Sequence, residues 1–509
     1  MSNRPSLFRS TLMLTGVGLV SQVFGFLYRI VMARLVGAQV LGLYQLIMPA
    51  YSVVQSICIS GLAVAVSLLS SEYHARKNEL ALRQLMSTGL RGLVALWLPV
   101  ALTVLFQSDF IARRLLGDGR TQLGLVLLLP VLLLTGVENL QKHQFYGIGA
   151  MRLPAGVELG EQVIRSIAII LLLALLAPEE EAHSVGLIVM GLLVSEIFSS
   201  TALTWGRRRR RRARGTELSG KRVEPGRLRR RMAGIAIPVS LTALVGNLMG
   251  AATSVLIPKL LMLHGLEQSQ AMEAFGILLG MTLPLLMIPT AFINALSLAL
   301  LPRLTEEREL GEMPSFRRTG EKAILSVSYV VLPLIALIAT LGPDLGQLLF
   351  GEPRVGDYML PLAVGVGAGC YHAILGCMLN ALGKQNQNAA ISLFCGALEL
   401  LLTVALTPAL GLGGFVAGFV CADVLAVVLC LGVAWRSAGL HLDCYRCFSA
   451  PVLASLLAGL LVNLGYRLSL DAGASLGWSV LTWGCAGLAA YLGAMAAQGI
   501  RPLRVIRLR

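Results

Sequence analysis

Charged side chains lie inside several long apolar segments of this sequence, where a membrane environment makes them energetically unfavourable. The segment "GFLYRIVMARLVGA", residues 25–38, carries Arg29 and Arg34, and "VELGEQVIRSI", residues 157–167, carries Glu158, Glu161 and Arg165. A guanidinium at the centre of a bilayer costs about 2.5 to 3.5 kcal/mol on insertion scales. Such residues usually face a cavity or a charged partner, so they are the first candidates for function.

The charges in residues 157–167 have helical spacing. Glu158, Glu161 and Arg165 are three and four residues apart, so they share one helix face, and Glu161 is placed to pair with Arg165. If this span enters the bilayer from the cytosol near residue 155, Arg165 lies about 16 Å inside, near the midplane. Two interpretations are open: a structural ion pair that fixes the helix in a bundle, or side chains that line a cavity.

Arg29 and Arg34 also have two interpretations. On a straight helix that starts at the cytoplasmic edge near residue 9, Arg29 lies about 30 Å along the axis, where its side chain can reach the outer surface. The glycines within residues 16–25, however, permit a bend. Gln22 and Arg29 are seven residues apart and occupy one stripe, which a bent helix would direct into a central cavity.

Further charges lie in other apolar segments. Lys259 is near the outer end of its span and is the corresponding cation in the second half of the chain, whereas Glu196, Glu399 and Asp423 are near the middle of theirs. Each of these carboxylates, like Glu158, is interpreted either as a site for a coupling cation or proton, or as a structural group. In the second case it is a neutral acid that hydrogen-bonds to a neighbouring helix.

Several fixed cations and few aromatic residues suit an anionic solute, because a guanidinium binds phosphate oxygens through parallel hydrogen bonds. We therefore expect a substrate cavity lined by Gln22, Arg29, Arg34, Glu161, Arg165 and Lys259. The sequence has no metalloprotease, nucleophile-elbow, P-loop or dinucleotide motif. It therefore predicts a transport protein and not an enzyme, without a cofactor or metal. Its energy would come from an Na+ or H+ gradient, the membrane potential, or the supply and removal of substrate.

The composition indicates an all-α integral membrane protein. Of 509 residues, 56% are hydrophobic and 14% are charged, which lies outside the range of soluble domains. Apolar runs of about 20 residues, long enough to span a bilayer as helices, recur along the chain. The first run lacks a small-residue cleavage site, so we expect a retained span. About fourteen transmembrane helices are expected, at 10–36, 41–70, 90–107, 121–140, 155–177, 184–205, 233–262, 274–301, 323–342, 358–382, 388–407, 412–435, 449–467 and 476–498.

The basic residues predict the topology. Most of the 42 lysines and arginines fall in segments that face the cytosol if the N-terminus does. This predicts an even number of spans in a bacterial cytoplasmic membrane, with both termini cytoplasmic. Thirteen of these residues lie between residues 206 and 232. We interpret this segment as a linker that faces anionic lipids, in preference to a nucleic-acid site.

The nine cysteines mostly lie inside apolar spans. Cys444 and Cys447 form a CxxC pair after the twelfth span. No further ligands of suitable spacing are nearby, so the sequence disfavours a metal or redox function there.

The sequence repeats itself at a nearly constant offset. Residues 49–72 align with residues 284–307, and residues 98–118 align with residues 332–352, at offsets of 235 and 234. A third, shorter pair of segments follows in the same order. Parallel repeats of this kind are a known transporter plan, with the pathway between the halves. We expect an N-terminal six-helix lobe over 1–206, a basic linker over 207–232, a C-terminal six-helix lobe over 233–440, and two additional helices with a basic tail over 441–509.

Six segments carry a resemblance to a known family: "GFLYRIVMARLVGAQVLGLYQLIMPAY", "GLAVAVSLLSSE", "GEQVIR", "LTALVGNLMGAATSVLIPKLL", "FGILLGMTLPLLMIPTAFINALSLALLPRLTEE" and "LNALGKQN". In order and spacing they resemble the stage V sporulation protein B group. That group belongs to the oligosaccharidyl-lipid branch of the multidrug/oligosaccharidyl-lipid/polysaccharide (MOP) exporter superfamily, which includes lipid II flippases. The similarity runs from about residue 7 to residue 435. The run Arg207–Arg212 is denser in arginine than the group pattern requires, and "KHQFYGIGAMRLP" replaces a more polar loop.

The resemblance implies a V-shaped, MATE-like bundle of two lobes that acts as a monomer and alternates between inward- and outward-facing states. It implies a polyprenyl-pyrophosphate-linked sugar as the substrate, of the undecaprenyl type, for peptidoglycan, spore-cortex or polysaccharide synthesis. By the same resemblance, Arg29 and Arg34 would contact the pyrophosphate, and the last two helices would form a groove for the polyprenyl tail.

Other functions predict different features. A multidrug or cation antiporter of the same fold would have an acidic cavity with aromatic walls, which Arg29, Arg34 and Arg165 disfavour. A membrane glycosyltransferase would need a sizeable outer loop with catalytic residues. A structural scaffold for wall synthesis is a further alternative.

Overall fold

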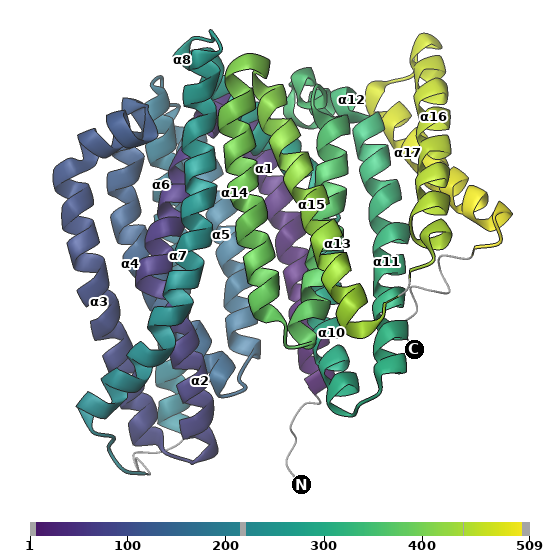
Figure 1. Ribbon diagram of the computed structural model, residues 1–509. Helices are drawn as coiled ribbons and strands as arrows, with labels where there is room; N and C mark the ends of the chain where they lie inside the picture. Colours follow the sequence, from purple (N-terminus) through teal and green to yellow (C-terminus); the bar gives the residue numbers. More distant parts are fainter. Residues whose placement is uncertain (1–6, 214–219, 441, 501–509) are drawn as a thin grey trace. The chain divides into compact units, whose positions relative to one another are not determined.

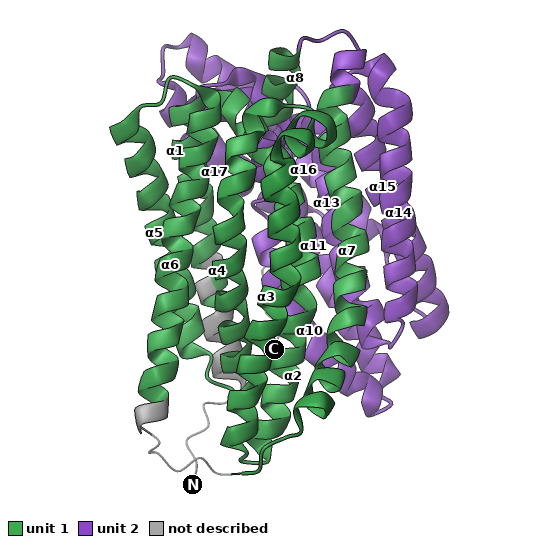
Figure 2. Ribbon diagram, turned by 90° about the vertical axis from the view of Figure 1, so that its left-hand side faces the viewer, with its two compact units in different colours: residues 1–259, 268–276 green, residues 260–267, 277–509 purple. Residues whose placement is uncertain are grey.

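A computed structural model describes residues 7–213, 220–440 and 442–500, and within these ranges the regular secondary structure consists of helices, with no strand (Figure 1). The chain forms two compact units (Figure 2). Unit 1 comprises residues 1–259 and 268–276, and unit 2 comprises residues 260–267 and 277–509.

Unit 1 contains the first seven long helices. Its elements, with α7 shared up to Lys259, are α1 (Leu7–Gln55), η1 (Ser56–Ser60), α2 (Gly61–Ala75), α3 (Glu79–Phe110), η2 (Ile111–Leu116), η3 (Gly119–Thr121), α4 (Gln122–Gly147), α5 (Arg152–Leu176), α6 (Glu181–Ala213), α7 (Pro225–Leu263) and α8 (Gln268–Phe275).

Unit 2 contains the remaining helices, including the two C-terminal ones. Its elements, from the end of unit 1 onward, are η4 (Gly276–Thr282), α9 (Leu283–Leu286), α10 (Thr290–Glu309), α11 (Met313–Thr340), α12 (Gly342–Phe350), η5 (Pro353–Gly356), α13 (Met359–Ala381), α14 (Gln385–Leu410), α15 (Leu412–Ala438), η6 (Tyr445–Ser449), α16 (Ala450–Asp471) and α17 (Leu476–Ala497).

Thirteen helical segments of the described chain are long and apolar enough to cross a membrane. One of them, Val20–Ala75, has 56 residues and would be about 84 Å long as one straight helix, far longer than a bilayer core is thick. Gly37 interrupts it with φ 76° and ψ 176°, a conformation that favours glycine. This break falls between the first two expected spans, so the fold class predicted from the sequence, with about fourteen crossings, is confirmed.

The span expected over residues 274–301 is not one continuous helix, and this part of the prediction was wrong. Helical structure runs from Gln268 to Leu286, stops, and resumes with α10 at Thr290. Pro289 lies at the break. Proline lacks a backbone N–H and disfavours the helical conformation of the residue before it, so the helix ends there.

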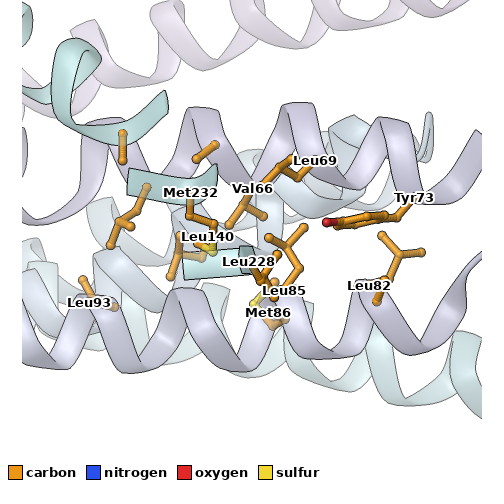
Figure 3. Packing of buried hydrophobic residues seen from close by; sticks show 14 of the residues in the cluster. Val66, Leu69, Tyr73, Leu82, Leu85, Met86, Leu93, Leu140, Leu228 and Met232 are labelled. Carbon is orange, nitrogen blue, oxygen red and sulfur yellow. The ribbon is translucent and has the colours of Figure 1, made fainter. Parts of the chain in front are cut away.

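The start of α7 packs into the core of unit 1. Figure 3 shows Leu228 and Met232 of α7 among side chains of α2, α3 and α4 that include Val66, Leu85 and Leu140, all of them buried. Inside a membrane such contacts stabilise the bundle mainly through van der Waals packing, because lipid tails are as apolar as these side chains. Unit 1 includes α7 up to residue 259, and the predicted lobes over 1–206 and 233–440 stay predictions.

The two units repeat one distinctive turn. In unit 1, Gly117 has φ 87° and the Asp118 carboxylate accepts a hydrogen bond of 2.9 Å from the backbone N–H two residues further on. In unit 2, Gly351 has φ 77° and the Glu352 carboxylate accepts the equivalent bond at 3.2 Å. Both glycines and both acids are 234 residues apart, so the structure supports the internal repeat.

Two glycines, Gly42 of α1 and Gly276 directly after α8, bring α1 and this segment of unit 1 into backbone contact. A Cβ atom on Gly42 would overlap the Met272 carbonyl, and a Cβ atom on Gly276 would overlap the Ala38 carbonyl and lie 2.8 Å from the Gly42 nitrogen. Gly42 and Gly276 are 234 residues apart, within one residue of the offset of the adjacent repeat block.

We expect Gly42→Ala to lower the thermal stability of the detergent-solubilised protein. The added methyl group meets rigid backbone, and overpacking of this kind costs about 1 to 3 kcal/mol. Gly250→Ala on α7 is the matched control, because nothing lies within 4 Å of a Cβ atom there. Equal melting temperatures for the two variants would show that the α1–α8 approach is not tight.

Candidate functional site

Helices α1, α4, α5 and α6 pack against one another within unit 1 (Figure 2), and most of the predicted charged residues of the first half lie among them. We call the following set the polar cluster: Tyr51 of α1, Thr135, Glu138 and Lys142 of α4, Glu158, Glu161 and Arg165 of α5, and Ser195 and Glu196 of α6.

Arg165 is the centre of one part of the polar cluster. Its guanidinium forms an ion pair with Glu161 one helical turn away and donates a hydrogen bond of 3.3 Å to the Ser195 hydroxyl. The nearest Glu196 oxygen lies 3.8 Å from it. The pairing of Glu161 with Arg165 that the sequence predicted is therefore present, and both partner carboxylates are buried.

Lys142 is the centre of the other part. Its ammonium lies 2.9 Å from a Glu138 oxygen and 3.7 Å from a Glu158 oxygen. Sequence reasoning missed Glu138 and Lys142, because it assigned Lys142 to a cytoplasmic loop beyond a span that ended at residue 140. Their acid-first spacing of four residues was the available signal.

Tyrosines of α1 line the cluster. The Tyr51 hydroxyl donates a hydrogen bond of 3.1 Å to Thr135 and lies within electrostatic reach of Glu161, Arg165 and Glu196. Arg29 and Arg165 both act electrostatically on Tyr28 and on Tyr44. The structure thus brings Arg29 and Arg165, which are 136 residues apart in the sequence, to the same two tyrosines.

The three predicted residues of the first span differ in their surroundings. Arg29 is half-buried and makes no ion pair or hydrogen bond with the described part of the chain. Arg34 and Gln22 are exposed, and Arg34 has an interaction partner. The residue with non-helical dihedrals inside α1 is Gly37, which lies beyond the glycines of residues 16–25 where the sequence permits a bend. The placement of these residues in a substrate cavity stays a prediction.

Lys259 lies apart from the polar cluster. Its ammonium donates hydrogen bonds of 3.0 Å and 2.8 Å to the backbone carbonyls of Arg114 and Leu115. These carbonyls are at the end of η2, where unpaired helix carbonyls attract a cation. The structure therefore gives this lysine a helix-capping contact, and its proposed contact with substrate stays a prediction.

Unit 2 holds the two remaining predicted carboxylates. Glu399 of α14 and Asp423 of α15 are half-buried, lie within electrostatic reach of each other, and have no ion pair with any described residue. Gly369 of α13 faces Asp423, because a Cβ atom built on it would lie 3.6 Å from that carboxylate.

No group of three or more His, Cys, Asp or Glu residues is placed to hold a metal ion within the described ranges. Cys444 is exposed, Cys447 is buried, and neither is in a disulfide.

The basic segment begins as a helical continuation of α6. Trp205 is exposed, and the Arg209 guanidinium lies 5.4 Å from its ring centre. The far end of the segment is bound to unit 1, since Asn78 donates a hydrogen bond of 3.0 Å to the Lys221 carbonyl and the Val223 amide donates one of 2.9 Å to Gln84. Part of the predicted lipid-facing linker, residues 214–219, lies outside the described residues.

Two solved structures share this fold. The first is the lipid II flippase MurJ in an inward closed conformation. The matched region covers 97% of this chain and 100% of MurJ, with a TM-score of 0.72 and 11% sequence identity. An inward-facing multidrug resistance MATE family transporter of the MOP superfamily covers 84% of this chain and 98% of its own, with a TM-score of 0.67 and 13% identity. The chain therefore shares the helical fold of these two transport proteins.

A family model and one relative also match the sequence of this chain. The chain belongs to the polysaccharide biosynthesis protein family, whose model matches residues 7–307. A relative is stage V sporulation protein B of Bacillus subtilis (strain 168), which is 23% identical over 436 residues, or 84% of this chain and 83% of that protein. The resemblance predicted from the sequence is confirmed.

Proposed function

We propose that this protein is a flippase that moves a polyprenyl-pyrophosphate-linked sugar, such as lipid II, across the bacterial cytoplasmic membrane by alternating access. Membership of the polysaccharide biosynthesis family and the fold shared with a lipid II flippase support a lipid-linked sugar. The product would serve peptidoglycan, spore-cortex or polysaccharide synthesis.

The observation that carries this proposal is the state of Arg29. A half-buried guanidinium that has no acidic partner in the described chain keeps its donors available for an anion, and a pyrophosphate accepts paired hydrogen bonds from it. Tyr28 and Tyr44 lie within the electrostatic reach of the same guanidinium. The Tyr44 hydroxyl is a further donor for phosphate or sugar oxygens, whereas the Tyr28 hydroxyl donates a hydrogen bond of 2.8 Å to the Met32 sulfur.

We also propose how the protein is oriented in the membrane and which lipids it contacts. Both termini would lie in the cytoplasm, and the protein would act as a monomer. The basic segment over 207–232 would bind anionic lipid headgroups, with the exposed Trp205 at the membrane interface. The polyprenyl tail of the substrate would stay in lipid beside α16 and α17.

A cation antiporter is the second candidate, and one observation favours it. The polar cluster contains four carboxylates, of Glu138, Glu158, Glu161 and Glu196, against the two cations of Lys142 and Arg165. An excess of acids suits an organic cation better than an anion.

Competition binding distinguishes the two candidates. We expect unlabelled undecaprenyl pyrophosphate to displace a fluorescent lipid-linked sugar from the purified protein, and a cationic dye such as ethidium to displace none. The physical reason is the charge of the unpaired Arg29. Displacement by ethidium alone would favour the antiporter and contradict the flippase.

A further inference from the structure

Glu196 is a buried carboxyl group with an incomplete set of partners. The residue is 5% exposed. Its Oε1 atom lies 3.8 Å from the Arg165 guanidinium, and its Oε2 atom has no hydrogen-bond partner. An ionised carboxylate removed from water normally accepts several hydrogen bonds or a close ion pair, so this environment is poor for the charged form.

The groups that face Glu196 come from every helix packed around it. They are Thr135 and Glu138 of α4, Glu161 and Arg165 of α5, and Tyr51 of α1. Arg165 is already paired with Glu161, and the nearest lysine is paired with Glu138. With every group ionised, the four carboxylates of the polar cluster would exceed its two cations by two negative charges. Such an excess inside a helical bundle favours uptake of a positive charge.

The geometry favours a proton over a metal ion as the positive charge that the polar cluster takes up. Within the described ranges no three carboxylate, histidine or cysteine ligands converge on one point, and a hard cation would need about six oxygen ligands. Hydroxyl groups also lie near the carboxyl group. The Tyr51 hydroxyl donates a hydrogen bond of 3.1 Å to Thr135 and lies within electrostatic reach of Glu196.

We propose that Glu196 is a proton-binding site whose protonation is coupled to anion binding at Arg29 and Arg165. This inference rests on the proposed function, because it takes Arg29 as a contact of the substrate pyrophosphate. When Glu196 is ionised, Glu161 and Glu196 together overcompensate the charge of Arg165. When Glu196 is protonated, one negative charge disappears beside Arg165, and the field at the tyrosines shared with Arg29 becomes more favourable to an anion.

The coupling has a defined sign. Protonation of Glu196 strengthens anion binding, so anion binding must in turn strengthen proton binding by the same factor. Affinity for the pyrophosphate lipid should therefore rise as the pH falls. One linked proton changes affinity by at most about tenfold per pH unit.

The test measures binding of undecaprenyl pyrophosphate to the purified full-length protein in nanodiscs between about pH 5 and pH 8. We expect the affinity of the wild-type protein to rise several-fold towards acid. Glu196→Gln, which mimics the protonated acid, should bind at the wild-type acid-limit affinity at every pH. Asp109→Asn is the matched control and should keep the wild-type slope, because Asp109 is 60% exposed and lies outside the polar cluster.

The outcomes separate this inference from the proposed function. Tight binding without any pH dependence in the wild-type protein would overturn the coupling and leave the flippase in place. Absence of binding at every pH would overturn both. If Glu196→Gln does not fold, proton uptake by the wild-type protein on addition of undecaprenyl pyrophosphate in weak buffer decides the matter. Uptake of a fraction of a proton per bound lipid supports the coupling, and no uptake refutes it.

Discussion

Replacing Arg165 with alanine should lower the free energy of unfolding by about 3 to 5 kcal/mol, because it leaves buried acids without their cation. Glu161 and Glu196 both lie beside this guanidinium and are buried among α4, α5 and α6. Thermal or chemical denaturation of the purified protein in detergent measures the loss.

Arg113→Ala is the matched control for this prediction. Arg113 also pairs with an acid four residues away, Asp109 at 2.6 Å, but the two side chains are 69% and 60% exposed. Exposed pairs of this kind contribute about 0 to 1 kcal/mol. If Arg113→Ala and Arg165→Ala were equally stable, the Arg165 pair would not be a buried structural element.

Replacing Arg29 with alanine should abolish transport and leave stability nearly unchanged. No described residue forms an ion pair or hydrogen bond with this guanidinium, so its removal leaves no buried charge unpaired. Complementation of a flippase-deficient bacterial strain should fail, while the amount of protein in the membrane stays normal. Arg29→Lys should restore part of the activity, because lysine keeps the charge but lacks the paired donors of arginine.

Arg91→Ala is the control for Arg29→Ala. Arg91 is an exposed arginine of α3 in the same unit, and its loss should leave complementation intact. Full complementation by Arg29→Ala at normal protein levels would remove Arg29 from the substrate site and leave surface snorkelling as the account of its position.

Local sequence patterns predicted the features that depend on residues close in the chain. The spacing of four residues between Glu161 and Arg165 predicted their ion pair, because one helical turn determines it. The end of the first span was predicted next to Gly37, where the chain takes a φ of 76°. The repeat offset was visible in the sequence because each copy keeps the acid that follows its positive-φ glycine, Asp118 or Glu352.

Contacts between helices could not be predicted in this way. Lys142 belongs to the polar cluster only because α4 and α5 pack together and bring Glu158 to it. Lys259 reaches the carbonyls of Arg114 and Leu115, which are more than 140 residues away in the sequence. A single sequence carries no signal for such long-range pairs. The expected depth of a charged residue in the membrane indicates that it needs a partner, but it does not identify that partner.

Transbilayer movement of a fluorescent undecaprenyl-pyrophosphate-linked sugar in proteoliposomes is the direct measure of flippase activity. The fraction of lipid that becomes accessible to a membrane-impermeant quencher is followed over time, with wild-type protein, Arg29→Ala and protein-free vesicles. We expect that wild-type protein accelerates the exchange and that Arg29→Ala vesicles behave like protein-free ones. Equal rates in wild-type and protein-free vesicles, in membranes where the protein is inserted and folded, would contradict this expectation.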